Sequence, residues 1–159
     1  MKKLLVLLVC LFVNYGFSQN PNFKIEDNLI KWQYVYNDSL NIDNLKSNLN
    51  LEFITDFSGN VKRSNFNDEK LNDQTSEFII EKKENKYRVT IYNIKIIPTQ
   101  MAFSMNGVTS MPKDIIRIEE ILLKNNKIKK TFWGVNLSEI LHPHYFDLFV
   151  MKQKIKEDW

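Results

Sequence analysis

Every second residue from Ile30 to Tyr36 carries a large apolar or aromatic side chain. A period of two residues is typical of a strand with one buried face, so residues 29–36 are expected to begin the folded domain. The next three residues, Asn-Asp-Ser at 37–39, offer capping side chains, and leucines recur near helical spacing at 40, 45 and 49. This pattern predicts a short amphipathic helix over about residues 39–50.

Two hairpins are predicted in the middle of the chain. Residues 51–57 and 61–66 flank Ser58-Gly59-Asn60, in which glycine and asparagine tolerate the positive φ angles of a tight turn. Residues 77–82 and 86–97 form the clearest strand pair, joined through residues 83–85. The apolar positions change parity after Asn93, which indicates a β-bulge or a strand end that is buried on both faces.

The last third of the chain combines an ambiguous apolar segment with a predicted helix. Residues 115–123 fit both a strand and a helix, and Asn125-Asn126 before residues 127–133 favours a further hairpin. Asn136 and Glu139 resemble a capping box, and an apolar stripe runs from there to Ile155. We expect Pro143 to kink or restart this C-terminal helix.

The order of predicted elements is strand, helix, several antiparallel strands, helix. This order predicts a single α+β domain over residues 29–157, in which a short helix follows the first strand and the C-terminal helix packs on one face of an antiparallel sheet. Residues 19–28 are mostly polar and contain a proline, so we expect a flexible lead-in there.

Residues 1–18 have the pattern of a cleavable secretory signal peptide. Lys2 and Lys3 precede an unbroken apolar run of ten residues, and Gly16-Phe17-Ser18 places small residues at the −3 and −1 positions of a cleavage site. A run of this length is too short to span a bilayer, which takes about 20 residues. We therefore expect export to the periplasm, with secretion or outer-membrane association as alternatives.

Removal of the signal peptide changes the composition of the chain. Without Lys2 and Lys3, the 22 basic residues become 20 against 19 acidic ones, a net charge of +1. Such a balance disfavours nucleic-acid binding, which requires many cations to neutralise phosphates. The only cysteine, Cys10, is removed as well, so neither disulfides nor thiol chemistry are expected in the mature chain.

Several segments resemble a family of small exported Gram-negative envelope proteins of unknown function with a TATA-binding-protein-like fold. They are Ile30-Lys31-Trp32, Phe57-Ser58-Gly59-Asn60, Phe78-Ile79-Ile80 and residues 85–91 with the sequence NKYRVTI. The resemblance covers mainly residues 28–97. It implies a fold and an envelope location but no reaction, and the name of the fold does not imply DNA binding.

The two histidines, His142 and His144, are the weak candidates for metal ligands. With Glu139 or Asp147 they outline a His/acid cluster near residues 139–147, and a hydrolase of unrecognised type would use it. No further ligand stands at a recognisable spacing, so polar side chains at a helix boundary are the simpler interpretation. We expect neither a bound metal nor any other cofactor.

The uncharged segment 98–112 is the most informative local feature of the sequence. It contains Met101, Phe103, Met105 and Met111, and flexible methionines suit contacts that must adapt to a ligand or partner. Alternatively, the segment folds back over the sheet and completes the core.

Our leading hypothesis is a non-enzymatic envelope module. The sheet or the Met/Phe segment of this module would bind an apolar ligand or a protein partner. A structural subunit that forms homo-oligomers is the other alternative to the hydrolase.

Overall fold

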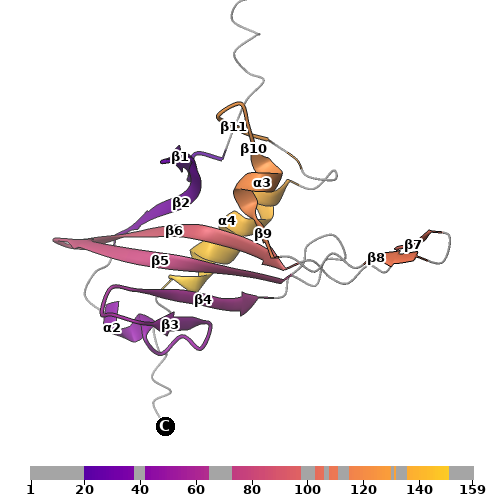
Figure 1. Ribbon diagram of the computed structural model, residues 1–159. Helices are drawn as coiled ribbons and strands as arrows, with labels where there is room; N and C mark the ends of the chain where they lie inside the picture. Colours follow the sequence, from indigo (N-terminus) through magenta and orange to yellow (C-terminus); the bar gives the residue numbers. More distant parts are fainter. Residues whose placement is uncertain are drawn as a thin grey trace, which may run out of the picture.

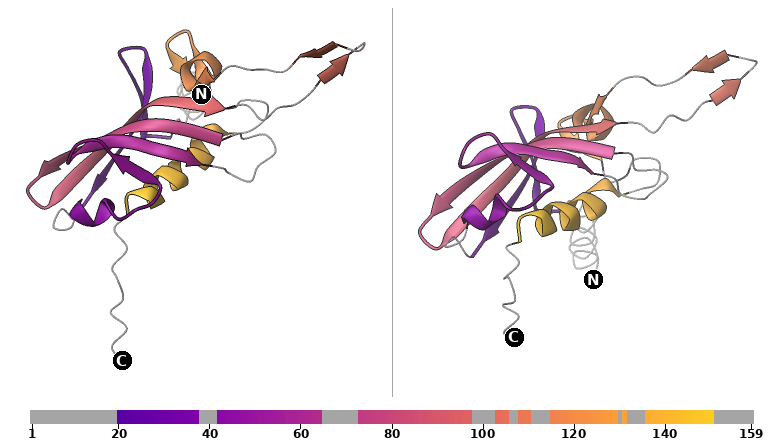
Figure 2. Two further views of the ribbon diagram at one scale, coloured as in Figure 1. Left: turned by 60° about the horizontal axis from the view of Figure 1, so that its bottom comes forward. Right: turned by 90° about the horizontal axis from the view of Figure 1, so that it is seen from below.

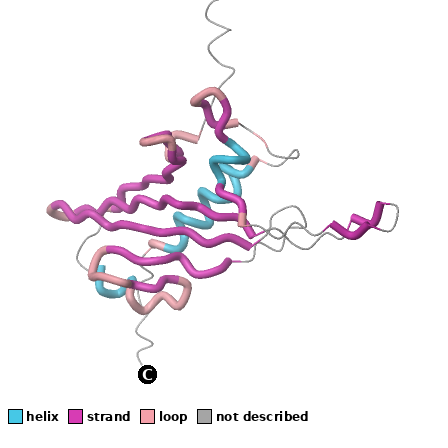
Figure 3. Tube along the Cα trace, viewed as in Figure 1, coloured by secondary structure: helices cyan, strands magenta, loops and turns pink. Residues whose placement is uncertain are grey.

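An antiparallel sheet in the order β1-β2-β6-β5-β4-β3 forms one layer of the protein, and helix α4 crosses one face of it (Figures 1 and 2). The computed structural model describes residues 20–37, 42–64, 73–97, 103–105, 108–110, 115–129, 131 and 136–150. Strands make up most of this part of the chain (Figure 3). The predicted α+β class is confirmed.

The elements are β1 (Phe23–Glu26), β2 (Leu29–Tyr36), α2 (Ile42–Leu45), β3 (Leu51–Phe53), β4 (Ser58–Ser64), β5 (Asp73–Lys83), β6 (Lys86–Ile97), β7 (Phe103–Met105), β8 (Val108–Ser110), β9 (Ile116–Arg117), α3 (Ile118–Leu122), β10 (Leu123–Lys124), β11 (Lys127–Ile128) and α4 (Leu137–Leu148).

Strand β1 lies within the predicted lead-in, so the prediction of a flexible segment was wrong for these residues. β1 pairs with β2 around a two-residue turn between Glu26 and Leu29. The turn residues Asp27 and Asn28 have φ angles of 54° and 61°. Positive φ at both central positions is the geometry of a type I′ hairpin, which asparagine and aspartate tolerate. The pairing buries Phe23 beneath the sheet edge.

Gly59 lies inside strand β4 and not in a turn, which corrects the predicted 51–57/61–66 hairpin. The connection between β3 and β4 is residues 54–57, and Gly59 pairs with Phe53. Its φ lies outside the left-handed region, so its role is to allow close approach of the two strands. A Cβ atom here would overlap the carbonyl oxygen of Glu52 and lie 2.9 Å from the Cα of Phe53.

The parity change on β6 is a β-bulge, one of the two predicted explanations. Thr75 of β5 pairs with Lys95, whereas Glu77 pairs with Tyr92, so β6 contains one extra residue. Asn93 takes up the bulge with a φ of 50°. Because of this insertion, the apolar side chains before and after the bulge are all buried on the same face.

Two helical predictions differ from the structure. Helix α2 is four residues long and not twelve, and Leu49 is 85% exposed. Ser47 donates a side-chain hydrogen bond to the carbonyl of Asn44, and such local bonds compete with the helical ladder.

Residues 118–122 form helix α3 and not the strand that the sequence pattern favours. On α3, Ile118, Ile121 and Leu122 are buried at helical spacing. The turn at Asn125-Asn126 was predicted correctly, but the strands beside it, β10 and β11, have only two residues each.

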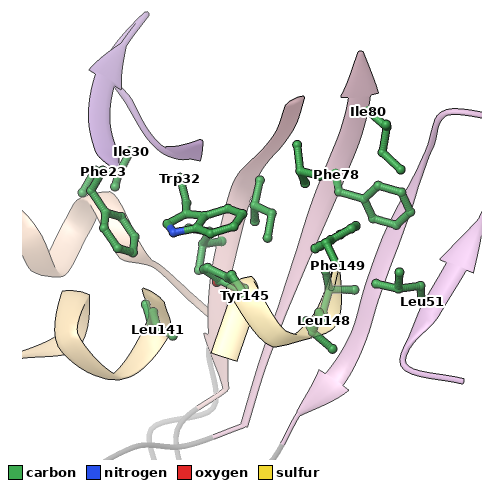
Figure 4. Packing of buried hydrophobic residues seen from close by; sticks show 14 of the residues in the cluster. Phe23, Ile30, Trp32, Leu51, Phe78, Ile80, Leu141, Tyr145, Leu148 and Phe149 are labelled. Carbon is green, nitrogen blue, oxygen red and sulfur yellow. The ribbon is translucent and has the colours of Figure 1, made fainter. Parts of the chain in front are cut away.

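Helix α4 contributes the stripe of Leu141, Tyr145 and Leu148, with Phe149 beyond its end, to the core (Figure 4). The ring of Tyr145 lies 5.5 Å from that of Trp32 on β2, and Phe149 lies 5.2 Å from Phe78 on β5. Offset and edge-to-face aromatic pairs contribute about 1 kcal/mol each beyond the burial of their area.

Helix α4 continues through Pro143 and does not restart there. The Pro143 side chain is exposed, so the carbonyl left without a helical partner is on the solvent side. The predicted capping box does not form: Asn136 is the N-cap residue, but its side chain accepts the Ser138 hydroxyl and makes no cap hydrogen bond.

The carbonyl groups at the end of α4 accept hydrogen bonds from three side chains, which we call the α4 clamp: Tyr36, Asn48 and Tyr87. Tyr36 donates to Phe146 at 3.0 Å, Asn48 to Leu148 at 2.8 Å, and Tyr87 to Phe149 at 2.6 Å. Burial raises the pKa of Tyr36, so its hydroxyl remains a donor. The last carbonyls of a helix have no helical i+4 donor, and the clamp provides side-chain donors for these three; the Phe146 carbonyl also accepts the Phe149 N–H at 3.2 Å.

Replacing Gly59 by alanine should destabilise the protein by about 1–3 kcal/mol, because the new methyl group meets backbone atoms of the neighbouring strand. Urea unfolding measures this change. The matched control is Asn60→Ala in the same strand, which should stay within about 0.5 kcal/mol of the wild type. Equal stability of Gly59→Ala and Asn60→Ala would contradict the role of Gly59 in the close approach of β3 and β4.

Candidate functional site

His142 and His144 lie two residues apart on α4 and face different surroundings. The Nδ1 atom of His142 accepts a hydrogen bond from the Trp32 indole N–H at 3.1 Å, and the Asn22 amide lies 3.4 Å from the same atom. An indole nitrogen can only donate, so Nδ1 of His142 is unprotonated and the neutral ring carries its proton on Nε2. His142 therefore acts as an acceptor within the fold.

Aromatic rings surround His142. The rings of Trp32, Tyr34 and Phe146 lie 6.0, 6.2 and 6.3 Å from the imidazole, measured between centroids. The same histidine therefore connects β2 with α4 through both hydrogen bonding and ring packing.

His144 faces a hollow at the other side of the helix. Burial lowers the pKa of His144, and the nearby Asp147 carboxylate opposes this effect in part. Glu139 is exposed on the first turn of the helix. Of the predicted His/acid cluster, only His144 and Asp147 lie close together, whereas His142 contacts Trp32 and Glu139 is exposed. Within the described ranges no group of three or more His, Cys, Asp or Glu side chains could hold a metal ion.

The hollow beside His144 is a groove of about 740 Å³ between the α2–β3 connection and the end of α4. Its lining combines seven polar or charged residues with four hydrophobic ones, and Asn48 of the α4 clamp forms part of its wall. The lining residues are Asp43, Asn44, Leu45, Ser47, Asn48, Leu49, Asn50, His144, Asp147, Leu148 and Val150.

A second groove, of about 390 Å³, lies on the face of the sheet away from α4. Glu77 lines it and alternates along β5 with Phe78, which packs against the helix side. Register shifts occur at this level on both sides of β5, with β4 and with β6. No local sequence pattern indicates this groove, because its residues come from four strands. They are Glu52, Asn60, Val61, Lys62, Arg63, Thr75, Ser76, Glu77, Asn93 and Lys95.

The uncharged segment forms a separate two-stranded hairpin, β7–β8. Phe103 pairs with Ser110, Ser104 with Thr109, and Met105 with Val108. Figures 1 and 2 show this hairpin well away from the sheet and from α4, beyond the ends of β6 and β9. The two strands do not lie over the sheet, as they would if the segment completed the core. Met101 and Met111 lie outside the described residues, as does the predicted signal peptide.

No protein-family profile, curated protein or solved structure matches this chain. No helix in the described part of the chain has the length and apolar character needed to cross a membrane.

The free energy of unfolding should decrease as the pH falls below about 6.5, in part because of His144. Burial lowers the pKa of folded His144, so the unfolded chain takes up a proton first, and stability is lost from the unfolded pKa down to the folded one. Urea unfolding at about pH 8 and about pH 5 measures the slope.

His144→Gln should reduce this pH dependence, since glutamine does not titrate. Asp147→Asn should increase it, because the carboxylate that favours protonated His144 is removed. An unchanged pH dependence in both variants would show that His144 does not contribute to the loss of stability at low pH.

Proposed function

We propose that this protein is a non-enzymatic, exported module of the bacterial envelope that binds a protein partner through the β7–β8 hairpin. The position of the hairpin carries this proposal: its two short strands lie apart from the sheet and from α4 (Figures 1 and 2). An isolated two-stranded hairpin is at best marginally stable in water, and further strands or a packing surface stabilise it. A partner protein would supply that surface.

The composition of the segment supports the same proposal. Residues 98–112 contain no charged side chain but include Phe103, Met105 and two further methionines. Aromatic residues and methionine are enriched in the cores of protein interfaces, whereas charged residues are depleted. Exposure of such an apolar segment to water is unfavourable, and contact with a partner surface would bury it.

The remainder of the domain is suited to act as the scaffold. The α4 clamp and the aromatic core hold the sheet and helix together, and binding segments are commonly loops that a rigid scaffold positions. In this proposal the sheet fixes the two ends of the hairpin segment, at β6 and β9, which pair with each other.

An apolar small ligand is less well supported than a protein partner. Polar or charged residues outnumber hydrophobic ones in both grooves, seven of eleven in the first and nine of ten in the second, whereas sites for apolar ligands are lined mostly by hydrophobic residues. The hydrolase alternative is also weakened, because His142 is engaged with Trp32 and His144 faces another side of α4.

Met105→Asp should strongly reduce capture of the partner, because it places a charge in the apolar hairpin. Tagged wild-type and variant chains would be used to recover partners from envelope extract, with quantification of each recovered protein. We expect recovery of at least one protein to fall about tenfold or more, which corresponds to about 1.4 kcal/mol.

The matched control is Val35→Asp, which introduces the same charge at a half-exposed position on the outer face of β2. It should leave recovery unchanged. Identical recovery by wild type and Met105→Asp, with both chains folded, would contradict the proposal.

A further inference from the structure

Strand β3 is an open edge of the sheet. Among the described residues, β3 pairs with β4 on one side only. Its pairing alternates, so the backbone groups of Leu51 and Phe53 point away from β4, while those of Glu52 point toward it. The Leu51 N–H is bonded to the carbonyl of Asn48, which leaves the Leu51 carbonyl and both polar groups of Phe53 on the open edge.

Apolar side chains are exposed at both ends of this edge. Leu49, just before β3, is 85% exposed, and Ile54, just after it, is 70% exposed. Phe57, in the same connection as Ile54, is 47% exposed. Exposed apolar groups beside unpaired strand groups are the features that favour pairing with another strand.

The hairpin and the β3 edge of one chain lie at opposite ends of the molecule. In Figures 1 and 2, β3 lies at one margin of the sheet beside α2, whereas β7 and β8 lie beyond the far end of β6. The hairpin therefore does not reach the β3 edge of its own chain.

We propose that the β7–β8 hairpin of one copy adds to the β3 edge of a second copy. This inference rests on the proposed function and names its partner. The lengths match, since β3, β7 and β8 each have three residues. Main-chain hydrogen bonds would extend the sheet, and the apolar hairpin would cover Leu49, Ile54 and Phe57.

If each copy donates its hairpin to the other, both the hairpin and the β3 edge of each chain gain a partner. Each copy then provides one hairpin and one edge, and two such contacts related by a two-fold axis close a dimer. The isolated hairpin gains the third strand that it lacks within its own chain.

Disulfide trapping between two differently tagged chains tests this contact. Both chains carry Cys10→Ser, which removes the only natural cysteine, so that only engineered cysteines react. One chain carries Ile54→Cys next to the β3 edge, and the other carries Ser104→Cys in the middle of β7. In the control, Lys83→Cys at the far end of β5 replaces Ile54→Cys.

We expect the Ile54/Ser104 pair to form the mixed disulfide at least about tenfold faster than the Lys83/Ser104 pair, a difference of about 1.4 kcal/mol in barrier. We also expect light scattering to give the mass of a dimer for the untreated protein. Equal trapping rates, or a monomer at the same concentration, would overturn the inference.

The capture experiment with Met105→Asp separates the two proposals. Loss of a different protein in that variant, together with no trapping, would mean that the hairpin binds a partner other than a second copy. An unchanged capture profile together with no trapping would contradict both proposals.

Discussion

The α4 clamp connects the two layers of the protein, and the position of α4 across the sheet depends on this connection. The register pairs Tyr36 of β2 directly with Tyr87 of β6, and their rings stack with centroids 4.7 Å apart and planes 9° apart. Stacking fixes both hydroxyl groups at the carbonyl end of α4, while Asn48 reaches a third carbonyl from the α2–β3 connection. Buried carbonyls without donors cost about 1–3 kcal/mol each, so the clamp strongly favours one position of the helix.

The clamp also explains how this domain presents its two proposed binding surfaces. Helix α4 covers one face of the sheet, β3 pairs only with β4 among the described residues, and strands β7 and β8 lie beyond the ends of β6 and β9. The histidines that sequence patterns suggest for chemistry take part in this packing instead: His142 accepts from Trp32, and the environment of His144 disfavours its charged form.

The sequence predicted most of the architecture but little of the candidate site. Alternation in residues 29–36 and 86–97 identifies central strands, because burial on one face imposes a period of two. Strand β1 and helix α3 were missed because short segments take their structure from tertiary contacts, such as the bond from the Ile30 N–H to Glu119. Gly59 was assigned to a turn because sequence does not distinguish a glycine that provides φ freedom from one that allows close approach. The open β3 edge depends on strand order, which no local pattern encodes.

Urea unfolding of the Tyr36→Phe/Tyr87→Phe double variant, in comparison with Tyr34→Phe, tests the role of the α4 clamp most directly. All three tyrosines belong to the same aromatic cluster, but of the three only Tyr36 and Tyr87 donate hydrogen bonds to carbonyl groups at the end of α4. We expect the free energy of unfolding of the double variant to fall by about 2–4 kcal/mol, while that of Tyr34→Phe stays near the wild-type value. A double variant as stable as Tyr34→Phe would contradict the central role of the clamp.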